Sequence, residues 1–283
     1  MRHLKGMAVL AGEYEGFIVD LWGVVHDGVR PYPGSVDCLA RLQAAGRRVV
    51  LLSNAPRTAA VVQVMLRGMG IGDDLYNGVM TSGEYCRALL AGGQDPQFGG
   101  NGRRLFHIGG RKDVNVFEGL DYTVVTDPAE ADFVLNTGPT PEEGEDSVEP
   151  YVARMEASAR AGLPMLCANP DIEVIRDGRR IICAGLLASY YAQMGGAVRL
   201  IGKPHPEVYE PVFEQLGLPR SRVIAVGDAL ATDMRGAKAT GIAGAWVLGG
   251  IHQEMIGNDA ALAEAEARSA GLAPEAVVPS FAW

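Results

Sequence analysis

Two apolar runs in this sequence each end at an aspartate, and this pattern constrains the fold more than any other feature. Asp20 directly follows Phe17-Ile18-Val19, and Asp228 follows Val223-Ile224-Ala225-Val226 after one glycine. Short continuous apolar runs are typical of strands that a parallel sheet buries on both faces. Open α/β sheets place their ligands at the carboxyl ends of such strands. The pattern therefore predicts an α/β protein whose functional site contains both carboxylates.

The segments after Asp20 alternate between strand and helix patterns. A helix is expected from Ser35, which can act as its N-cap, to just before Gly46. A strand over residues 47–52, a helix over about 57–69 and a short strand over 78–80 follow. Repeated strand–helix pairs of this length imply a Rossmann-like, doubly wound parallel sheet.

The middle of the chain has the pattern of a second domain. Residues 94–103 are glycine-rich and polar, as in a surface loop, and residues 173–183 around Asp177-Gly178 favour a β-hairpin. A helix over 186–194 then returns the chain to the core at Arg199. The other expected elements are strands at 105–108, 122–125, 132–136 and 164–167 and helices at 151–161 and 260–270.

Composition excludes several classes of function. The formal net charge of −9 argues against a nucleic-acid partner and requires a local positive site for any anionic substrate. The four cysteines lack the spacing of a metal cluster, and no segment is apolar for long enough to span a membrane. The apolar stretch before Glu13 is too short for a signal peptide, so a cytoplasmic location is the default expectation. The oligomeric state stays open, with a homodimer as one option.

Asp20 and Lys203 are the candidate catalytic residues. A carboxylate that attacks phosphorus forms an aspartyl phosphate and divides one displacement into two easier steps. Lys203 follows an apolar lead-in and can neutralise charge on both the carboxylate and the transferring phosphoryl group. The structural alternatives are an aspartate that caps a loop and a lysine in an exposed turn.

Other polar residues complete the expected site. Asp228 offers a hard oxygen ligand for Mg²⁺ together with Asp20, and Asp233 holds a metal-bound water or orients Lys203. Ser53 and Asn54 end a neighbouring strand, where hydroxyl and N–H groups can cradle phosphate oxygens. The remaining candidates lie on loops: Asn169 and Asp171 for substrate contact, and His26 and Asp27 for proton transfer, although a turn explains the last two as well.

Several strings together resemble the class IIA branch of the haloacid dehalogenase (HAD) superfamily, which includes nitrophenylphosphatase-like and nucleotide-monophosphatase-like proteins. The resemblance covers about residues 16–250. It implies a core of residues 1–82 and 196–283, an α/β cap inserted at 83–195, Mg²⁺ as cofactor and small phosphorylated metabolites as substrates. The strings are Asp20…Gly23-Val24, Pro33-Gly34, Leu52-Ser53-Asn54, Thr81-Ser82-Gly83, Asn169-Pro170-Asp171, Gly202-Lys203-Pro204 and Gly227-Asp228…Thr232-Asp233.

Trp22 departs from this family pattern. The phosphatases of the superfamily have an aspartate there, which protonates the leaving group and later activates water, whereas an indole cannot ionise for that work. The backbone carbonyl of Trp22 remains available as a metal ligand. We therefore expect a Mg²⁺-dependent phosphatase, with slow turnover as one consequence of Trp22. The alternatives are a weakly active or inactive binding or regulatory protein, and a dehalogenase-type hydrolase.

Overall fold

The computed structural model of the chain forms two compact units. It describes residues 1–93, 95, 97–98, 102–176, 179–249, 257 and 259–283. The first unit comprises Met1–Ser53, Val62–Met80 and Lys203–Trp283, and the second comprises Asn54–Val61 and Thr81–Gly202. Part of the loop expected at 94–103, and the hairpin turn expected at Asp177-Gly178, lie outside the described residues.

The first unit contains a seven-stranded sheet with β2 (Gly16–Val19) near its centre. Its order is β1-β14-β13-β12-β2-β3-β4. Phe17 pairs in parallel with Ile224 of β12 and with Val49 of β3, and every residue of β2 is buried. The apolar run before Asp20 is therefore a central strand. The other strands are β1 (Arg2–His3), β14 (Ala276–Val278), β13 (Ala243–Val247), β12 (Val223–Gly227), β3 (Arg48–Ser53) and β4 (Gly78–Thr81).

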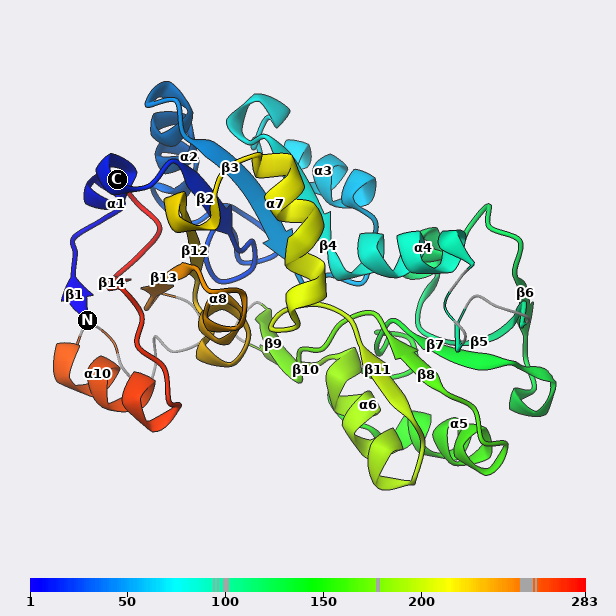
Figure 1. Cartoon of the computed structure of the whole chain (residues 1–283). Coiled ribbons are helices and arrows are strands. Elements are labelled where there is room, and N and C mark those ends of the chain that lie inside the picture. Colours follow the sequence, from blue (N-terminus) through cyan, green and yellow to red (C-terminus); the bar gives the residue numbers. More distant parts are fainter. Residues whose placement is uncertain (94, 96, 99–101, 177–178, 250–256, 258) are drawn as a thin grey trace. The chain divides into compact units, whose positions relative to one another are not determined.

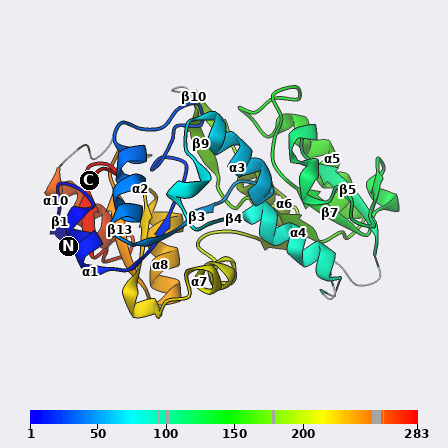
Figure 2. The same cartoon turned by 90° about the horizontal axis from the view of Figure 1, so that it is seen from above.

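Helices cover both faces of this sheet, as a doubly wound fold requires. Helices α2 (Ser35–Ala44) and α3 (Ala59–Gly68) lie on one face, and α7 (Glu210–Leu216) and α8 (Arg235–Thr240) lie on the other (Figure 2). Two further helices are α1 (Ala8–Glu13) and α10 (Ala260–Ser269). The shorter helical turns are η1 (Asp73–Leu75), η4 (Pro206–Tyr209), η5 (Arg220–Arg222) and η6 (Leu230–Met234). Among the described residues, no helix is both long and apolar enough to cross a membrane.

Ser35 does not cap α2 in the way that the sequence suggested. The N-cap position is Gly34, which has φ +85°, and Ser35 is the first helical residue. The Ser35 hydroxyl lies 2.9 Å from the carbonyl oxygens of Val25 and Tyr32, to which it can donate. A hydroxyl has one proton to donate, so it bonds one of these two carbonyls at a time, and either bond ties the helix to the loop that follows Asp20.

The second unit contains a parallel five-stranded sheet of order β11-β8-β7-β5-β6. Figure 1 shows α5 and α6 on one side of this sheet and α4 on the other. Alternate residues of β7 face the two layers: Val134 packs in the α5–α6 core, and Phe133 and Leu135 pack in the α4 core. The strands are β5 (Arg104–Ile108), β6 (Thr123–Val125), β7 (Phe133–Asn136), β8 (Met165–Cys167) and β11 (Val198–Leu200). The helical elements are α4 (Ser82–Gly92), η2 (Arg111–Val116), η3 (Pro128–Glu130), α5 (Glu149–Arg160) and α6 (Ala184–Gln193).

The expected hairpin is confirmed, but the strand after α6 lies elsewhere than predicted. Strands β9 (Glu173–Arg176) and β10 (Arg179–Ile182) pair antiparallel. Strand β11, which we placed in the core from the sequence, pairs in parallel with β8, with Arg199 opposite Leu166. The carboxyl end of β8 thus gains its second neighbour from a strand of only three residues, too short for its pattern to reveal its partner.

His107 in β5 makes the second unit sensitive to acid. Its Nε2 atom lies 2.9 Å from the Thr137 hydroxyl, and its ring centroid lies 5.1 Å from that of Phe117. Burial lowers the pKa of His107 from 6.5 to about 4. Below pH 6.5 the imidazole is therefore protonated in the unfolded chain but not in the folded chain. The free energy of unfolding falls as the pH is lowered from 6.5 to about 4.

We expect this histidine to remove up to about 3 kcal/mol of unfolding free energy between pH 6.5 and pH 4. His107→Gln, whose amide can still bond Thr137, should lose less stability over that range than the wild type. Urea unfolding at several pH values measures the difference. An equally steep acid limb in the variant would contradict the assignment.

Candidate active site

Three side chains lie at the same carboxyl edge of the first unit's sheet. Asp20 follows β2, Asp228 follows β12, and Ser53 ends β3. The register places Val226 and Leu51 opposite Val19 on its two sides, so the three strands end side by side. Asp20 continues the ladder, because its N–H donates to the Val226 carbonyl oxygen at 2.9 Å.

Lys203 joins two carboxylates in this cluster. Its Nζ atom lies 2.6 Å from Asp20 Oδ1 and 2.7 Å from Asp233 Oδ1. The side chains are almost fully buried, with exposed fractions of 4% for Lys203, 11% for Asp20 and 4% for Asp233. Ligand oxygens of Asp20, Asp228 and Asp233 all lie within 4.8 Å of one another. The residues that the sequence places far apart therefore form one buried site.

Burial and mutual charge control the ionisation of this cluster. Burial lowers the pKa of Lys203, but the charges of Asp20 and Asp233 outweigh it, so the pKa is raised and the ammonium stays charged. Burial also raises the pKa of Asp20 well above its ordinary value; Lys203 opposes that shift, and Asp233 and Asp228 add to it. A further positive charge would favour the ionised form of Asp20.

Two glycines make room for the carboxylates. Gly23 has φ +80°, and a Cβ atom there would overlap the Asp228 carboxylate. A Cβ atom on Gly227 would overlap the Asp233 side chain. Gly23 therefore serves both the turn after Asp20 and the close approach of Asp228, and Gly227 lets Asp233 pack against the end of β12.

The structure adds two buried aromatic residues that the sequence analysis missed. Trp246 of β13 donates its indole N–H to the Asp228 carbonyl oxygen at 2.9 Å. Tyr209 has an exposed fraction of 1%, and burial raises the pKa of its hydroxyl, as does the charge of Asp233. A single aromatic residue in an apolar pattern reads as core, so no sequence signal marks either one.

The donor set fits a divalent cation. The joined cluster contains three carboxyl groups and one ammonium group, so its formal charge is negative when all are ionised. Carboxylate oxygens are the ligands that Mg²⁺ prefers, and it commonly takes only one or two carboxylates beside water and phosphate oxygens. Asp20 and Asp228, together with the backbone carbonyl of Trp22, would hold it.

The Trp22 indole packs against the loop that follows it. A Cβ atom on Gly28, which has φ +92°, would overlap the indole ring. The indole also lies edge-on to His26, with ring centroids 5.8 Å apart. His26 Nδ1 accepts the Gly28 N–H at 3.0 Å. Trp22, His26 and Gly28 therefore form one packed cluster, which we call the indole cluster.

The pKa values of His26 and Asp27, the two candidates for proton transfer, are both lowered. Burial lowers the pKa of His26 to about 4, so the imidazole is neutral near pH 7. The Asp27 carboxylate accepts the N–H groups of Val29 and Arg30, both at 2.8 Å, and these bonds outweigh its desolvation and lower its pKa. Asp27 therefore stabilises the turn.

The other predicted substrate residues come together in the second unit. Asn54 Nδ2 donates to Asp171 Oδ1 at 2.7 Å, and Asp171 N–H donates to Asn169 Oδ1 at 2.9 Å. Asn54 and Asn169 are buried. These three residues thus form a network of their own.

The fold and this cluster define a class, and the chain belongs to the haloacid dehalogenase-like hydrolases. Models of this family match residues 17–123 and 87–241, and a HAD-hydrolase-like model matches residues 200–283. A haloacid dehalogenase-like hydrolase from Brucella suis 1330 has a similar structure, with 32% identity, a TM-score of 0.83 and coverage of 98% of this chain and 99% of that one.

Two phosphatases are also similar to the chain. A 4-nitrophenylphosphatase from Schizosaccharomyces pombe is 22% identical over 263 residues, which cover 86% of each protein. A glycerol phosphate phosphatase from Mycobacterium tuberculosis, solved in complex with magnesium, is 26% identical, with a TM-score of 0.67 and coverage of 88% of this chain and 71% of that one. The relatives thus include HAD-family phosphatases of the class IIA type.

Proposed function

We propose that the protein is a Mg²⁺-dependent phosphatase that hydrolyses a small phosphate monoester through an aspartyl phosphate on Asp20. The observation that carries this proposal is the buried contact of Lys203 with both Asp20 and Asp233 beside Asp228. The similarity to phosphatases of the same family supports it.

The side chains have distinct parts in the proposed reaction. A carboxylate oxygen of Asp20 forms a bond to phosphorus while the bond from phosphorus to the leaving oxygen breaks, and the leaving oxygen keeps the electron pair and takes a proton from water. Lys203 stabilises the charge on Asp20 and on the phosphoryl oxygens, and Asp233 holds the ammonium group in place. Ser53 offers its hydroxyl to the phosphoryl group from the adjacent strand. Water then attacks phosphorus, which releases orthophosphate and restores the carboxylate.

A bound Mg²⁺ would supply positive charge beside Asp20 and the phosphoryl oxygens. Asp20, Asp228 and the Trp22 carbonyl would hold the ion. Asp233 would either bind a water molecule of the ion or contact Lys203 alone. Burial raises the pKa of Asp20, and a positive charge beside it would favour the ionised carboxylate that the proposed attack requires.

We also propose that the second unit is the cap of this enzyme and determines its substrate. It has its own sheet and its own cores. Its first segment begins directly after Ser53 and its last ends directly before Lys203, with Val62–Met80 belonging to the first unit between them. A cap that encloses the substrate would exclude water from the reaction.

One observation favours a second candidate, a weakly active protein that binds a phosphorylated ligand. The position where the family has an acid carries Trp22, whose ring packs in the indole cluster. Leaving groups that need a proton would then depart slowly.

Hydrolysis of 4-nitrophenyl phosphate tests the proposed function. The purified full-length protein should release nitrophenolate with Mg²⁺, lose that activity after treatment with EDTA, and regain it when Mg²⁺ is added in excess. Nitrophenolate is a good leaving group, so the assay does not depend on the missing acid. Undiminished turnover in EDTA would contradict the metal-dependent mechanism, and absent turnover would favour the binding protein.

A further inference from the structure

The side chain of Asn54 is held by two hydrogen bonds of opposite polarity. Its Nδ2 atom donates to Asp171 Oδ1 at 2.7 Å, and its Oδ1 atom accepts from the Ser82 hydroxyl at 3.3 Å. A bond to a carboxylate is stronger than one between neutral groups. The amide plane of Asn54 therefore has one preferred orientation, and Asp171 contributes most to it.

Asp171 is itself fixed from both sides. Its N–H donates to Asn169 Oδ1 at 2.9 Å, and its carbonyl oxygen accepts the Gly185 N–H at 3.0 Å from the first turn of α6. A Cβ atom on Gly185 would overlap the carbonyl groups of Pro170 and Asp171. The loop from Asn169 to Asp171 is thus clamped between the end of β8 and the start of α6, and its carboxylate is placed before any ligand arrives.

The chain segment before Lys203 packs on the same amide. Gly202 has φ +129°, and a Cβ atom there would overlap Ser82 Oγ and Asn54 Oδ1. Asn54 directly follows Ser53, and Gly202 directly precedes Lys203. The two segments that lead from the second unit to the proposed phosphate-binding residues therefore meet at the Asn54 amide.

We infer that Asp171 is a positioning residue for the reaction, and that it acts through Asn54 by fixing the Ser53–Asn54 peptide that faces the phosphoryl group. This inference rests on the proposed function. Asp171 then contacts neither the substrate nor the reacting atoms, in contrast to the substrate contact expected from the sequence. The role of Asp171 would be the same for every phosphate ester, because it acts on the binding of the phosphoryl group, which all of these substrates contain.

Asp171→Ala should lower kcat/KM for 4-nitrophenyl phosphate by about 10-fold or more, the range expected from a lost hydrogen bond to a charged group. It should weaken inhibition by orthophosphate by a similar factor, although orthophosphate has no leaving group. Asp171→Asn keeps an acceptor oxygen but not the charge, so it should recover part of the loss. That conservative variant also serves if Asp171→Ala does not fold.

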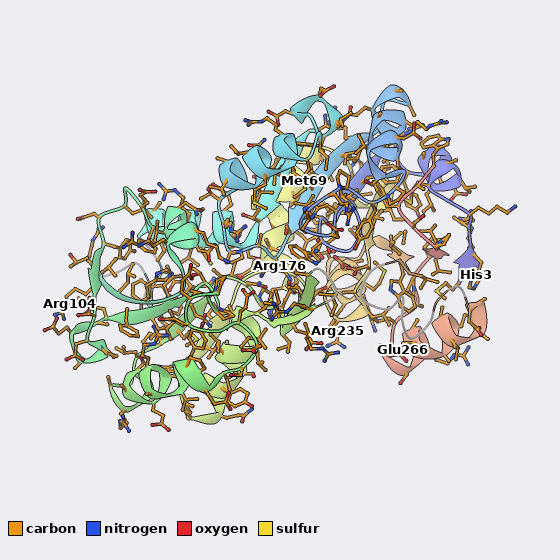
Figure 3. The ribbon with its side chains drawn as sticks, turned by 180° about the vertical axis from the view of Figure 1, so that it is seen from behind. His3, Met69, Arg104, Arg176, Arg235 and Glu266 are labelled. Atoms are coloured by element: carbon orange, nitrogen blue, oxygen red, sulfur yellow. The ribbon has the colours of Figure 1, made fainter. Side chains whose placement is uncertain are left out.

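A double-mutant cycle separates positioning from direct contact. Once Asn54→Ala has removed the amide, the further change Asp171→Ala should cost less than about 2-fold, because both substitutions break the same link. As a control, Asp132→Ala removes a carboxylate of the same unit that accepts a different N–H group, the backbone N–H of Arg104 at 2.8 Å. Arg104 lies at the periphery of the second unit (Figure 3), so this variant should keep wild-type kinetics.

Losses that multiply in the double variant, or an orthophosphate affinity that Asp171→Ala leaves unchanged, would show that Asp171 contacts the leaving group and would overturn the inference. A wild type that neither hydrolyses phosphate esters nor binds orthophosphate would contradict the proposed function as well. The two failures are therefore distinguishable.

Discussion

Asp20→Asn is expected to abolish phosphate-ester hydrolysis, with a loss of at least about 10⁴-fold in kcat, the scale seen when a covalent nucleophile is removed. Asparagine has nearly the same shape as aspartate. Its amide oxygen can still accept the Leu21 N–H, which Asp20 Oδ1 accepts at 2.8 Å. The variant lacks the anionic oxygen that attacks phosphorus, so the chemistry should be lost while the fold is kept.

Single-turnover and steady-state assays measure this loss, and urea unfolding verifies the fold. The variant also removes one carboxylate from a cluster of three around one ammonium group, so we expect no loss of stability from charge. Asp37→Asn is a matched control, because Asp37 is an exposed residue of α2 that pairs with Arg41. Asp20→Asn activity within about 10-fold of the wild type would exclude Asp20 as the nucleophile, because the expected loss is far larger.

Much of the core could be predicted because its strands are buried on both faces. The runs before Asp20 and Asp228 contain hardly any polar residue and coincide with β2 and β12, whose residues are all buried. In a parallel sheet, neighbouring strands end at one edge, so the approach of Asp20 to Asp228 follows from topology alone. The contact of Lys203 with Asp20 does not follow from this reasoning, because the strand before Lys203, β11, belongs to the sheet of the second unit.

Other features depend on tertiary contacts that leave no local pattern. The segment Asn54–Val61 belongs to the second unit because its polar groups are satisfied there: Arg57 pairs with the buried Asp113 at 2.9 Å, and Asn115 Oδ1 accepts the Thr58 N–H at 2.8 Å. These partners lie more than fifty residues away in the sequence. Strand β11 is a similar case, since three half-buried residues suit either sheet.

The site shows the same division. The chemistry proposed for the site follows from residue type at four charged positions, Asp20, Lys203, Asp228 and Asp233. The indole cluster, in contrast, depends on shape. Gly28 appears in the sequence as half of an Asp-Gly turn, yet the structure also needs a glycine there because the Trp22 ring occupies the space beside it. No periodicity or spacing encodes such a contact.

Trp22→Asp is expected to raise kcat for alkyl phosphates by about 10²–10⁴-fold, the contribution typical of a positioned general acid. Alkoxide leaving groups need a proton in the transition state, whereas nitrophenolate does not. The wild type should therefore hydrolyse 4-nitrophenyl phosphate much faster than an alkyl phosphate, and the substitution should narrow that ratio. Removing the indole also removes its packing on Gly28 and His26, so the variant should be less stable.

Trp22→Asn is the control that isolates the effect of the carboxyl proton. It creates the same cavity as Trp22→Asp, and the new side chain has almost the same shape, but an amide cannot donate a carboxyl proton to the leaving group. The ratio of kcat for the Trp22→Asp variant to kcat for the Trp22→Asn variant, compared between an alkyl and an aryl phosphate, then measures general-acid catalysis free of packing effects. A second readout is the dependence of kcat on leaving-group pKa, which should be steep in the wild type and in Trp22→Asn and shallow in Trp22→Asp. If the wild type already hydrolyses both esters equally well and Trp22→Asp only slows it, the proton comes from another group. Trp22 would then be a wall of an ordinary active site, held in shape by Gly28 and His26.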